Sequence, residues 1–350
     1  MFGRASSLLG LDIGTSSIKA VELSQDGDAY TVSGFGQMDV VPDVPPKDII
    51  KEMLGNFPIR SRRTCTSVSG RSVIVRYVSM PEMSHNDLQS AIRFEADKYI
   101  PFEVDEVVLD CQRLEEGANA APKEGAETPE MKVLLVAVKR SLIDDHVVTL
   151  QEAGLTPQII DVDSFALGNA FEFRDILSPR VEEKEKVVAL IDIGANKTNI
   201  NIKRGRTSYF TREIYLAGND FTDAISKRLG LEMAEAEGLK RDPGERIGEL
   251  MEAVSPTIED LGNEVHLSFD YFENQYDAEV EEVYLSGGGA RFPQLEETFA
   301  RIFDRKTALW DPTENLEIGS RVDAGLLKQN ASQLAIAMGL AARIRKEPGA

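Results

Sequence analysis

"LLGLDIGTSSIKAVEL" occupies residues 8–23, and "VVALIDIGANKTNINI" occupies residues 187–202. In each stretch an apolar run predicts a buried strand, Asp-Ile-Gly ends that run, and a second half-apolar run follows. A single turn of this kind is most often an ordinary hairpin in which Asp and Gly satisfy the bend. Two copies, with Asp12 and Asp192 at matching positions half a chain apart, predict two related lobes that face each other.

Length, charge and composition limit the functions that this chain can have. Its 350 residues correspond to about two domains at ~100–200 residues each. The formal net charge of −20 excludes binding to nucleic acid or anionic lipid by charge alone, because no surplus of cations exists to pair with phosphates. No apolar stretch approaches the ~20 residues of a membrane-spanning helix. Cys65 and Cys111 are isolated, and we expect structural thiols in a reducing cytoplasm.

The order of elements predicts an α/β protein, because strands and helices alternate along most of the chain. Residues 85–99 are expected to form a helix that begins after Ser84 as its N-cap and is stopped by Pro101. This helix opens a helix-strand-strand-helix-strand unit over residues 79–163. We interpret the unit as a small inserted subdomain.

The residues that follow Asp12 are suited to binding phosphate. Their backbone N–H groups and hydroxyls can point toward one place, and such concave turns bind phosphate oxygens without net positive charge. Lys19 follows on the next strand and is expected to aim its ammonium at the same phosphates. Asp12 and Asp192, brought face to face by the lobes, would hold a hydrated Mg²⁺, which typically uses one or two carboxylates plus phosphate oxygens. The turn residues are Gly14, Thr15, Ser16 and Ser17.

A third glycine cluster and a charged helix complete the candidate site. In "YLSGGGARFPQL" (284–295) a strand ends in three glycines, where a flat base could lie against backbone and Arg291 could stack on it. Taken alone, this cluster is typical of a loop that enters a helix. Glu237 and Lys240 lie on one face of a predicted helix and could hydrogen-bond a ribose, although a surface ion pair is the simpler interpretation. The glycines are Gly287, Gly288 and Gly289.

The order of these motifs resembles that of the actin-like ATPase superfamily, whose members share a two-lobed, ribonuclease H-like α/β fold. The resemblance makes the first turn phosphate-1, the second turn phosphate-2 and "SGGGARFP" the adenosine motif, and it implies ATP and Mg²⁺ as ligands. It also implies that helices at 163–173 and 333–343 connect the lobes and that Asp163 positions the hydrolytic water. The implied phosphate-2 residues are Gly194, Ala195 and Asn196.

One departure from the superfamily pattern concerns hydrolysis. Phosphate-2 of efficient members is often Asp-x-Gly-Gly-Gly-Thr, whereas this chain has "DIGANKT" at 192–198. Ala195 and Asn196 add side chains where the backbone must approach the terminal phosphate. We therefore expect ATP binding with slow turnover or none by the protein alone, well below the ~1 s⁻¹ low end of typical enzymes.

Residues 91–110, "AIRFEADKYIPFEVDEVVLD", resemble more specifically the PilM family, the actin-like cytoplasmic proteins of type IV pilus assembly. This resemblance implies an FtsA-type layout, in which an inserted subdomain replaces the usual second subdomain of the first lobe. The implied subdomains are 1A (1–78, 164–186 and 325–350), 1C (79–163), 2A (187–218 and 276–324) and 2B (219–275).

The family resemblance also implies partners. The short cytoplasmic N-terminal tail of PilN, a single-span membrane protein, would lie in a groove beside the insert and would link the protein to PilO. Pilus motor ATPases and the platform protein PilC are further implied partners. The protein is then expected to be cytoplasmic and peripheral to the inner membrane, where partners and not lipid hold it.

Periodicity of the predicted helix 85–99 suggests which residues line that groove. Leu88, Ala91, Ile92 and Tyr99 form one apolar stripe that suits packing on the strands of the insert. Phe94 lies about 100° further round the helix than that stripe. With Arg93 beside it, Phe94 is a candidate groove residue, and the alternative is that it packs on a neighbouring loop.

Two functions of other classes stay open at this point. A small-molecule kinase of the same fold would use Asp192 as general base toward an acceptor hydroxyl, but we see no polar insertion for an acceptor pocket. A cell-division actin-like protein (FtsA) usually ends in a linker and an amphipathic membrane helix. We expect no such helix in residues 335–350.

Overall fold

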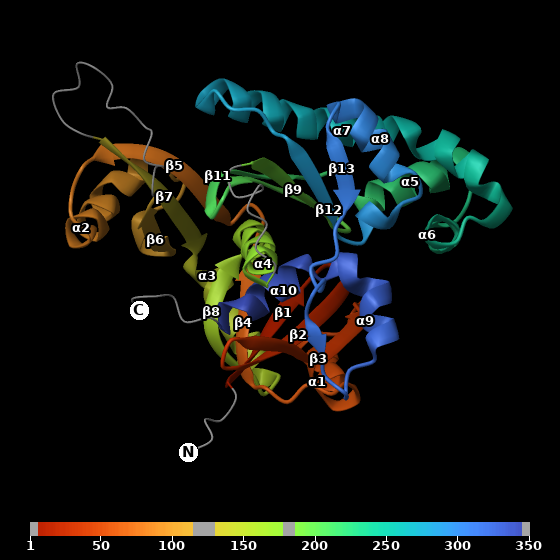
Figure 1. Ribbon diagram of the computed structural model, residues 1–350, viewed down its shortest axis with the longest axis horizontal. Coiled ribbons are helices and arrows are strands. Elements are labelled where there is room, and N and C mark those ends of the chain that lie inside the picture. Colours follow the sequence, from red (N-terminus) through yellow and green to blue (C-terminus); the bar gives the residue numbers. More distant parts are fainter. Residues whose placement is uncertain (1–5, 115–129, 178–185, 345–350) are drawn as a thin grey trace. The chain divides into compact units, whose positions relative to one another are not determined.

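The first Asp-Ile-Gly stretch builds the centre of a six-stranded sheet (Figure 1). The structure is a computed structural model, in which residues 6–114, 130–177 and 186–344 are described. The strands are β1 (Ser6–Ile13), β2 (Ser17–Asp26), β3 (Ala29–Asp39), β4 (Arg63–Val68), β8 (Thr156–Val162) and β14 (Glu317–Ile318). β1, β2 and β3 form an antiparallel meander, β4 joins β1 in parallel, and β8 and β14 are the edge strands.

The second Asp-Ile-Gly stretch builds a five-stranded sheet on the same plan. Its strands are β9 (Val187–Ile193), β10 (Thr198–Arg204), β11 (Thr207–Ile214), β12 (Glu282–Ser286) and β13 (Lys306–Leu309). β9, β10 and β11 again form an antiparallel meander, and β12 joins β9 in parallel as β4 joins β1. The orders β3-β2-β1-β4 and β11-β10-β9-β12 therefore match, which confirms the two related lobes expected from the repeated motif.

Two helices join the lobes through one continuous core. α4 (Asp163–Leu177) and α10 (Ala335–Ala341) pack against each other, and α10 also packs on β1. A Cβ atom on Gly339 would lie 1.7 Å from the carbonyl oxygen of Ala166, so this approach of two helix backbones requires glycine. The surrounding core takes side chains from both sheets, among them Val21 of β2 and Leu190 of β9. Both connecting helices expected from the sequence are present.

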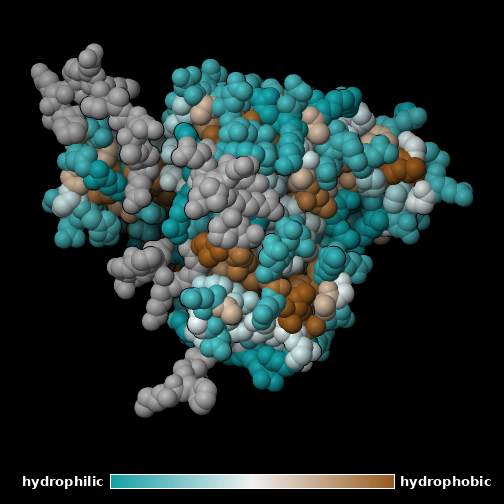
Figure 2. All heavy atoms as spheres, viewed as in Figure 1, coloured by the Kyte–Doolittle hydropathy of each residue, from teal (hydrophilic) through white to brown (hydrophobic). Residues whose placement is uncertain are grey.

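The remaining helices of the lobes lie mostly on the five-stranded sheet. They are α1 (Pro46–Asn56), α5 (Gly218–Leu229), α6 (Met233–Arg241), α7 (Ile247–Tyr276), α8 (Leu295–Phe303) and α9 (Ala324–Asn330). Phe221 of α5, Phe269 of α7 and Phe299 of α8 are buried in one core with the strands. Most of the outward side of α7 is hydrophilic in the space-filling view of Figure 2. No helix among the described residues is long and apolar enough to cross a membrane.

Residues Val68–Glu152 form a compact unit of their own, inserted between β4 and β8. Its elements are β5 (Val73–Pro81), α2 (His85–Glu95), β6 (Val107–Arg113), β7 (Glu130–Lys139) and α3 (Arg140–Glu152). β7 is the middle strand of a three-stranded antiparallel sheet, with β5 on one side and β6 on the other. Leu88 and Ile92 of α2 share a buried core with Val133 and Leu135 of β7, so α2 covers one face of this sheet.

The insert begins and ends earlier in the chain than the expected range of 79–163. β5 belongs to the insert because it pairs with β7 along its whole length. β8 belongs instead to the six-stranded sheet, where it lies beside β4. The ranges expected for the other subdomains stay predictions, and their residues 1–5, 178–185 and 345–350 lie outside the described residues.

Helix α2 is shorter than the expected 85–99. Ser84 caps its start as predicted, because the Ser84 hydroxyl accepts a hydrogen bond from the backbone N–H of Asp87. A 3₁₀ turn over Ala96–Lys98 follows the helix directly. Tyr99 therefore lies beyond the helix and packs, partly buried, at the edge of the core of the insert.

Candidate functional site

The two Asp-Ile-Gly turns have the same backbone geometry. In the first, the N–H of Gly14 donates to the carbonyl oxygen of Ser17 at 3.2 Å. In the second, the N–H of Gly194 donates to the carbonyl oxygen of Lys197 at 2.9 Å. Each hydrogen bond closes a turn between two antiparallel strands, so the residues at matching positions can be compared one by one. The turn residues exposed at the surface are Thr15, Ser16 and Asn196.

Asp12 of the first turn is neutralised by a lysine of its own lobe. Lys19 lies opposite Asp12 in the pairing of β1 with β2, and its ammonium is 2.9 Å from the Asp12 carboxylate. Burial by itself would lower the pKa of Lys19, but the adjacent Asp12 carboxylate outweighs burial, and the pKa is raised. The lysine expected to point at phosphates thus bonds to the predicted magnesium ligand.

Asp192 of the second turn is buried without a lysine opposite. Its partner in the pairing of β9 with β10 is Asn199, which is also buried. Asp192 accepts a hydrogen bond from the hydroxyl of Ser286 on β12 at 3.0 Å. Burial raises the pKa of Asp192 to about 6, and the negative charge of Asp12 adds to this rise. An additional cation beside the two carboxylates would therefore be stabilised.

Asp163, the acid expected to position water, is held by a lysine of the second turn. Asp163 is the first residue of α4, and its carboxylate accepts a hydrogen bond from the ammonium of Lys197 at 2.8 Å. The same ammonium lies 3.3 Å from the carboxylate of Glu213 on β11. Burial would lower the pKa of Lys197, but the two carboxylates raise it. Lys197 is therefore a bridging cation and stays protonated.

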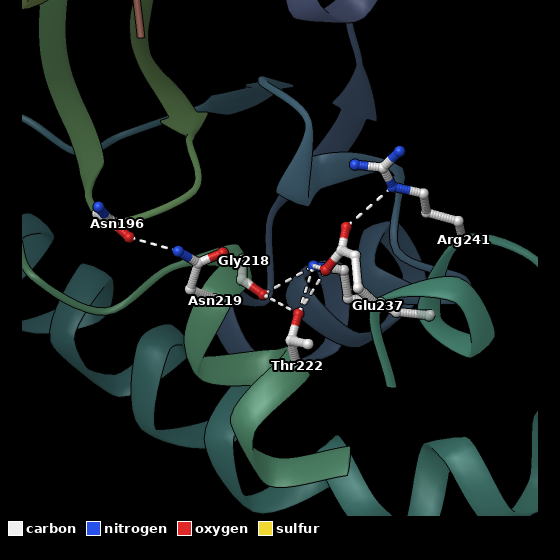
Figure 3. A network of polar contacts seen from close by, with 7 residues as sticks. Asn196, Gly218, Asn219, Thr222, Glu237 and Arg241 are labelled. Carbon is white, nitrogen blue, oxygen red and sulfur yellow. Dashed lines mark hydrogen bonds and ion pairs between the residues drawn. The ribbon is translucent and has the colours of Figure 1, made fainter. Parts of the chain in front are cut away.

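The N-terminus of α5 is attached to the second turn. The backbone N–H of Gly218 donates to the carbonyl oxygen of Gly194 at 3.0 Å, and that of Asn219 donates to the carbonyl oxygen of Ala195 at 2.8 Å. The side chain of Asn219 also donates to the amide oxygen of Asn196 at 2.5 Å (Figure 3). The turn and the start of α5 are thus joined by two backbone hydrogen bonds and one side-chain hydrogen bond.

Glu237 and Lys240 of α6 form an ion pair that bonds to the start of α5 (Figure 3). The ammonium of Lys240 donates to the carbonyl oxygen of Gly218 at 2.9 Å and to the hydroxyl of Thr222 at 2.8 Å. The Thr222 hydroxyl in turn donates to Glu237 at 2.6 Å. Burial would raise the pKa of Glu237, but the hydrogen bonds from Lys240 and Thr222 outweigh burial and lower it. The pair is thus more than a surface contact, because it connects α6 with the second turn through α5.

The glycine triplet lies against the same turn. Gly287 has φ +92°, and a Cβ atom there would lie 2.3 Å from the carbonyl oxygen of Ile193. A Cβ atom on Gly289 would lie 2.5 Å from the Ile193 side chain. The expected helix-entry loop is therefore also a close backbone contact with the end of β9. Gly288 and Arg291 are exposed beside it.

The acidic pair fits a magnesium ion that takes most of its ligands from water and phosphate. The oxygen donors at this place are the carboxylates of Asp12 and Asp192 and the hydroxyl of Ser286. Oxygen donors suit Mg²⁺, and the raised pKa of Asp192 reflects negative charge that a cation would offset. Within the described ranges, no group of three or more His, Cys, Asp and Glu side chains is arranged to hold a metal.

Arg93 and Phe94 lie on the exposed side of α2. Both residues belong to the compact unit Val68–Glu152, whereas the candidate nucleotide residues belong to the other unit. The Phe94 side chain is 84% exposed, whereas Leu88 and Ile92 of the same helix are buried. The alternative that Phe94 packs on a neighbouring loop does not fit this exposure. The Phe94 ring is therefore accessible to a binding partner.

Sequence reasoning missed three residues that the structure brings to the second turn. Ser286 precedes the glycine triplet, and its parallel pairing with Asp192 places its hydroxyl on that carboxylate. Thr222 has the i+4 spacing from Gly218 that brings it under the ion pair of α6. Lys197 was part of the quoted turn, but its partner Asp163 lies on another element.

Two matching lobes, joined by α4 and α10 and each carrying an Asp-Ile-Gly turn, define a protein of the actin-like ATPase fold. Ethanolamine utilization protein EutJ from Carboxydothermus hydrogenoformans shares this fold, with a TM-score of 0.53 and 15% identity over 98% of this chain and 91% of that chain. A family model described as type IV pilus assembly protein PilM matches residues 10–345, and the chain belongs to this family.

A solved structure supports the same family assignment. In a "PilM-PilN type IV pilus biogenesis complex", one chain is similar to this protein with a TM-score of 0.84 and 29% identity. The match covers 97% of this chain and 99% of that chain. The inserted unit is therefore included in the similarity. These findings favour pilus assembly over a small-molecule kinase or a cell-division protein.

Proposed function

We propose that this protein binds ATP and Mg²⁺ between its lobes as the actin-like component of the type IV pilus platform at the inner membrane. One observation carries the nucleotide site: Asp12 and Asp192 end equivalent strands of matching sheets, and the glycine triplet packs against the second turn. Membership of the PilM family supports the role in pilus assembly.

Each group of residues has a role in this proposal. The N–H groups and hydroxyls of the first turn, 14–17, donate to phosphate oxygens, and Gly194 to Asn196 face them from the second turn. Asp12 and Asp192 hold the hydrated metal, whose positive charge offsets both the carboxylates and the phosphates. The exposed Gly288 and Arg291 lie against the base, and Glu237 and Lys240 contact the ribose while they hold α5 beside the second turn.

A titration of the purified protein with MgATP tests the nucleotide site. Asp12→Ala and Asp192→Ala are each expected to weaken binding at least tenfold, which corresponds to about 1.4 kcal/mol. Asp26→Asn is a matched control, because Asp26 is exposed and is the last residue of β2, at the opposite end of that strand from Lys19. Unchanged affinity in both site variants would rule out the proposed site.

Slow turnover is a second part of the proposal. Ala195 and Asn196 stand where efficient members of the superfamily have glycine, and Lys197 holds the carboxylate of Asp163. Phosphate release by the isolated protein is expected to stay well below ~1 s⁻¹. Hydrolysis at several molecules per second would show that the second turn admits the attacking water.

The inserted unit is proposed to bind the cytoplasmic tail of PilN. The chain similar to this protein in the PilM-PilN complex matches over nearly its whole length, and this protein exposes Phe94 on α2. A short tail must become ordered when it binds, so buried aromatic anchors supply much of the affinity. We propose that Phe94, with Arg93 beside it, is such an anchor.

Fluorescence anisotropy with a labelled tail peptide tests this surface. Phe94→Ala is expected to weaken binding by ~1–3 kcal/mol and to leave MgATP binding and the melting temperature nearly unchanged. Val148→Ala is the matched control, since Val148 is a half-exposed apolar residue on α3 of the same unit. If Phe94→Ala binds the tail with wild-type affinity, Phe94 is not an anchor. The tail would then be expected on the other face of the three-stranded sheet, where Val75, Leu134 and Val136 are partly exposed.

PilO, the pilus motor ATPases and PilC are proposed as partners reached through PilN or the platform. The net charge of −20 opposes direct binding to anionic lipid, so the proposed attachment to the inner membrane depends on protein partners. A pull-down from solubilised membranes is expected to recover PilN and PilO together. Recovery of PilO that persists when PilN is deleted would show that this protein contacts another platform protein directly.

A further inference from the structure

Lys197 has no counterpart in the first turn. The hydrogen bond that closes each turn runs from a glycine N–H to the carbonyl oxygen three residues later, which belongs to Ser17 in the first turn and to Lys197 in the second. Ser17 is buried and small, whereas Lys197 extends a charged side chain. The second lobe therefore places a cation where the first lobe has a hydroxyl.

The ammonium of Lys197 is fixed by two carboxylates from different elements. It lies 2.8 Å from Asp163 at the start of α4 and 3.3 Å from Glu213 on β11. The side chain of Lys197 is 21% exposed and that of Asp163 is 11% exposed, so solvent screens this contact only in part. A carboxylate oxygen that accepts a charge-assisted hydrogen bond is a weaker base and has one acceptor position fewer for water.

This contact bears on hydrolysis because of what the reaction requires. The oxygen of water forms a bond to the γ-phosphorus of ATP, and the bond from that phosphorus to the bridging oxygen breaks with its electron pair on ADP. The proton that water loses must be accepted by a base. Asp163 is the acid that the superfamily resemblance assigns to orienting this water, and here its carboxylate already accepts from an ammonium.

We propose that Lys197 is an inhibitory positioning residue, which holds the carboxylate of Asp163 so that ATP is bound and is not turned over. This inference rests on the proposed nucleotide site and adds to it the reason for slow hydrolysis. In this proposal Lys197 acts through the carboxylate of Asp163. Displacement of Lys197 from Asp163 would free the carboxylate for water.

Phosphate release under single-turnover conditions gives the first test. Lys197→Met is expected to raise the rate at least tenfold, since positioned acids and bases contribute about 10²- to 10⁴-fold. Lys197→Arg keeps the charge and is expected to stay slow, and Lys197→Met combined with Asp163→Asn is expected to return to the slow rate. Lys51→Met is the matched control, because Lys51 pairs with Asp48 on the surface helix α1. Lys197→Gln serves in place of Lys197→Met should the latter fail to fold.

Two readouts that do not depend on turnover accompany this test. In the absence of nucleotide, Asp163→Asn is expected to destabilise wild type more than it destabilises Lys197→Met in urea, because only wild type loses the ion pair. In titrations, Lys197→Met is expected to change the affinities for ATP and ADP by less than about threefold each. Additive effects in urea, or a tenfold loss of affinity for ATP alone, would overturn the inference.

The outcomes also separate this inference from the nucleotide site on which it rests. Absence of MgATP binding by wild type contradicts the proposed function. Normal MgATP binding with unchanged turnover in Lys197→Met contradicts only the inhibitory role of Lys197.

Discussion

The first and second Asp-Ile-Gly turns share a backbone and differ in how their charges are satisfied. In the first turn, the lysine opposite Asp12 binds that carboxylate directly at 2.9 Å. In the second turn, the residue opposite Asp192 is Asn199, and the lysine of the turn bonds to Asp163 and Glu213 instead. In the first lobe the charge of Asp12 is thus balanced by Lys19. In the second lobe Asp192 is a buried carboxyl group whose pKa is raised to about 6.

The difference shows how two copies of one supersecondary unit can divide a task. Asp12 and Lys19 form a neutral pair that stabilises the first lobe without a ligand. The ionised form of Asp192 is disfavoured by burial and by the charge of Asp12, and the hydrogen bond from the hydroxyl of Ser286 offsets part of this cost. A site that is strained in the free protein and relieved by a ligand gains affinity at the expense of stability.

Lys19→Met tests the first lobe and is expected to have the largest effect. The substitution leaves Asp12 buried without its cation and also removes the positive charge that lowers the pKa of Asp192. Loss of one partner of a buried ion pair typically destabilises by ~3–5 kcal/mol, and we expect a decrease near the lower value in the free energy of unfolding. Urea denaturation at pH 7.5 measures it.

A second substitution separates charge from packing in this variant. Lys19→Met combined with Asp12→Asn is expected to recover most of the lost stability, because no unpaired carboxylate is left in the first lobe. If the double variant is as unstable as Lys19→Met, the effect comes from packing around residue 19 and the contrast between the turns does not depend on charge.

Asp192→Asn tests the second lobe and is expected to act in the opposite direction. The pKa of Asp192 is about 6 in the folded protein and 3.8 in the unfolded chain. Between these two pH values the folded state therefore binds more protons than the unfolded state. The contribution of Asp192 to stability therefore falls as pH rises from about 4 to about 6, and the full penalty is present above pH 6. Asn removes a penalty of roughly 2–3 kcal/mol at pH 7.5.

The pH dependence is the check on this prediction. Urea denaturation of wild type and Asp192→Asn, without nucleotide or Mg²⁺, is expected to show a difference at pH 7.5 that shrinks toward pH 4. Under the proposed function MgATP should raise the melting temperature of wild type, and Asp192→Asn is expected to lose this rise. A variant less stable than wild type at pH 7.5 would contradict the view that Asp192 is strained.

Ser286→Ala sharpens the comparison from the side of β12. The hydroxyl of Ser286 is fully buried and donates to the Asp192 carboxylate at 3.0 Å. A hydrogen bond to a charged group contributes ~1.5–3 kcal/mol, and we expect a loss of about 1.5 kcal/mol above pH 6 and less below pH 4. The apparent pKa of Asp192, followed by carboxyl NMR, is expected to rise further above 6. An unchanged NMR titration would mean that Ser286 does not stabilise the ionised form.

The lobes and their turns could be predicted from the sequence because each depends on a local pattern. Apolar runs that end in Asp-Ile-Gly define β1 and β9, and the repetition of the pattern defines the matching sheets. The hairpin between β2 and β3 is equally local, because Gly27 and Asp28 form its two-residue turn and Gly27 has φ +61°. Such features are determined by neighbouring residues, so one sequence is sufficient to find them.

Features that depend on distant residues could not be predicted in the same way. The sequence of the strand at 156–162 does not indicate which sheet it joins, so the predicted end of the insert is wrong. Only the position of this strand beside β4 assigns it to the six-stranded sheet. Lys197 was seen as part of a phosphate turn, but its bond to Asp163 spans the second turn and α4. The partner of Asp192 depends on the register of β12, which no local pattern encodes.

Asn196→Ala tests whether side chains or backbone hold the second turn to α5, and the expected effect is the smallest. Asn196 is exposed, and its amide oxygen accepts one hydrogen bond from Asn219. The two backbone hydrogen bonds from the start of α5 to the carbonyl oxygens of Gly194 and Ala195 do not involve this side chain. We expect the free energy of unfolding to change by less than ~0.5 kcal/mol, as is usual for exposed positions.

Asn219→Ala is the matched control, and the double variant should lose no more stability than either single variant, because both remove the same hydrogen bond. A loss above ~1 kcal/mol for Asn196→Ala would mean that the hydrogen bond between Asn219 and Asn196 is what fixes α5 beside the second turn.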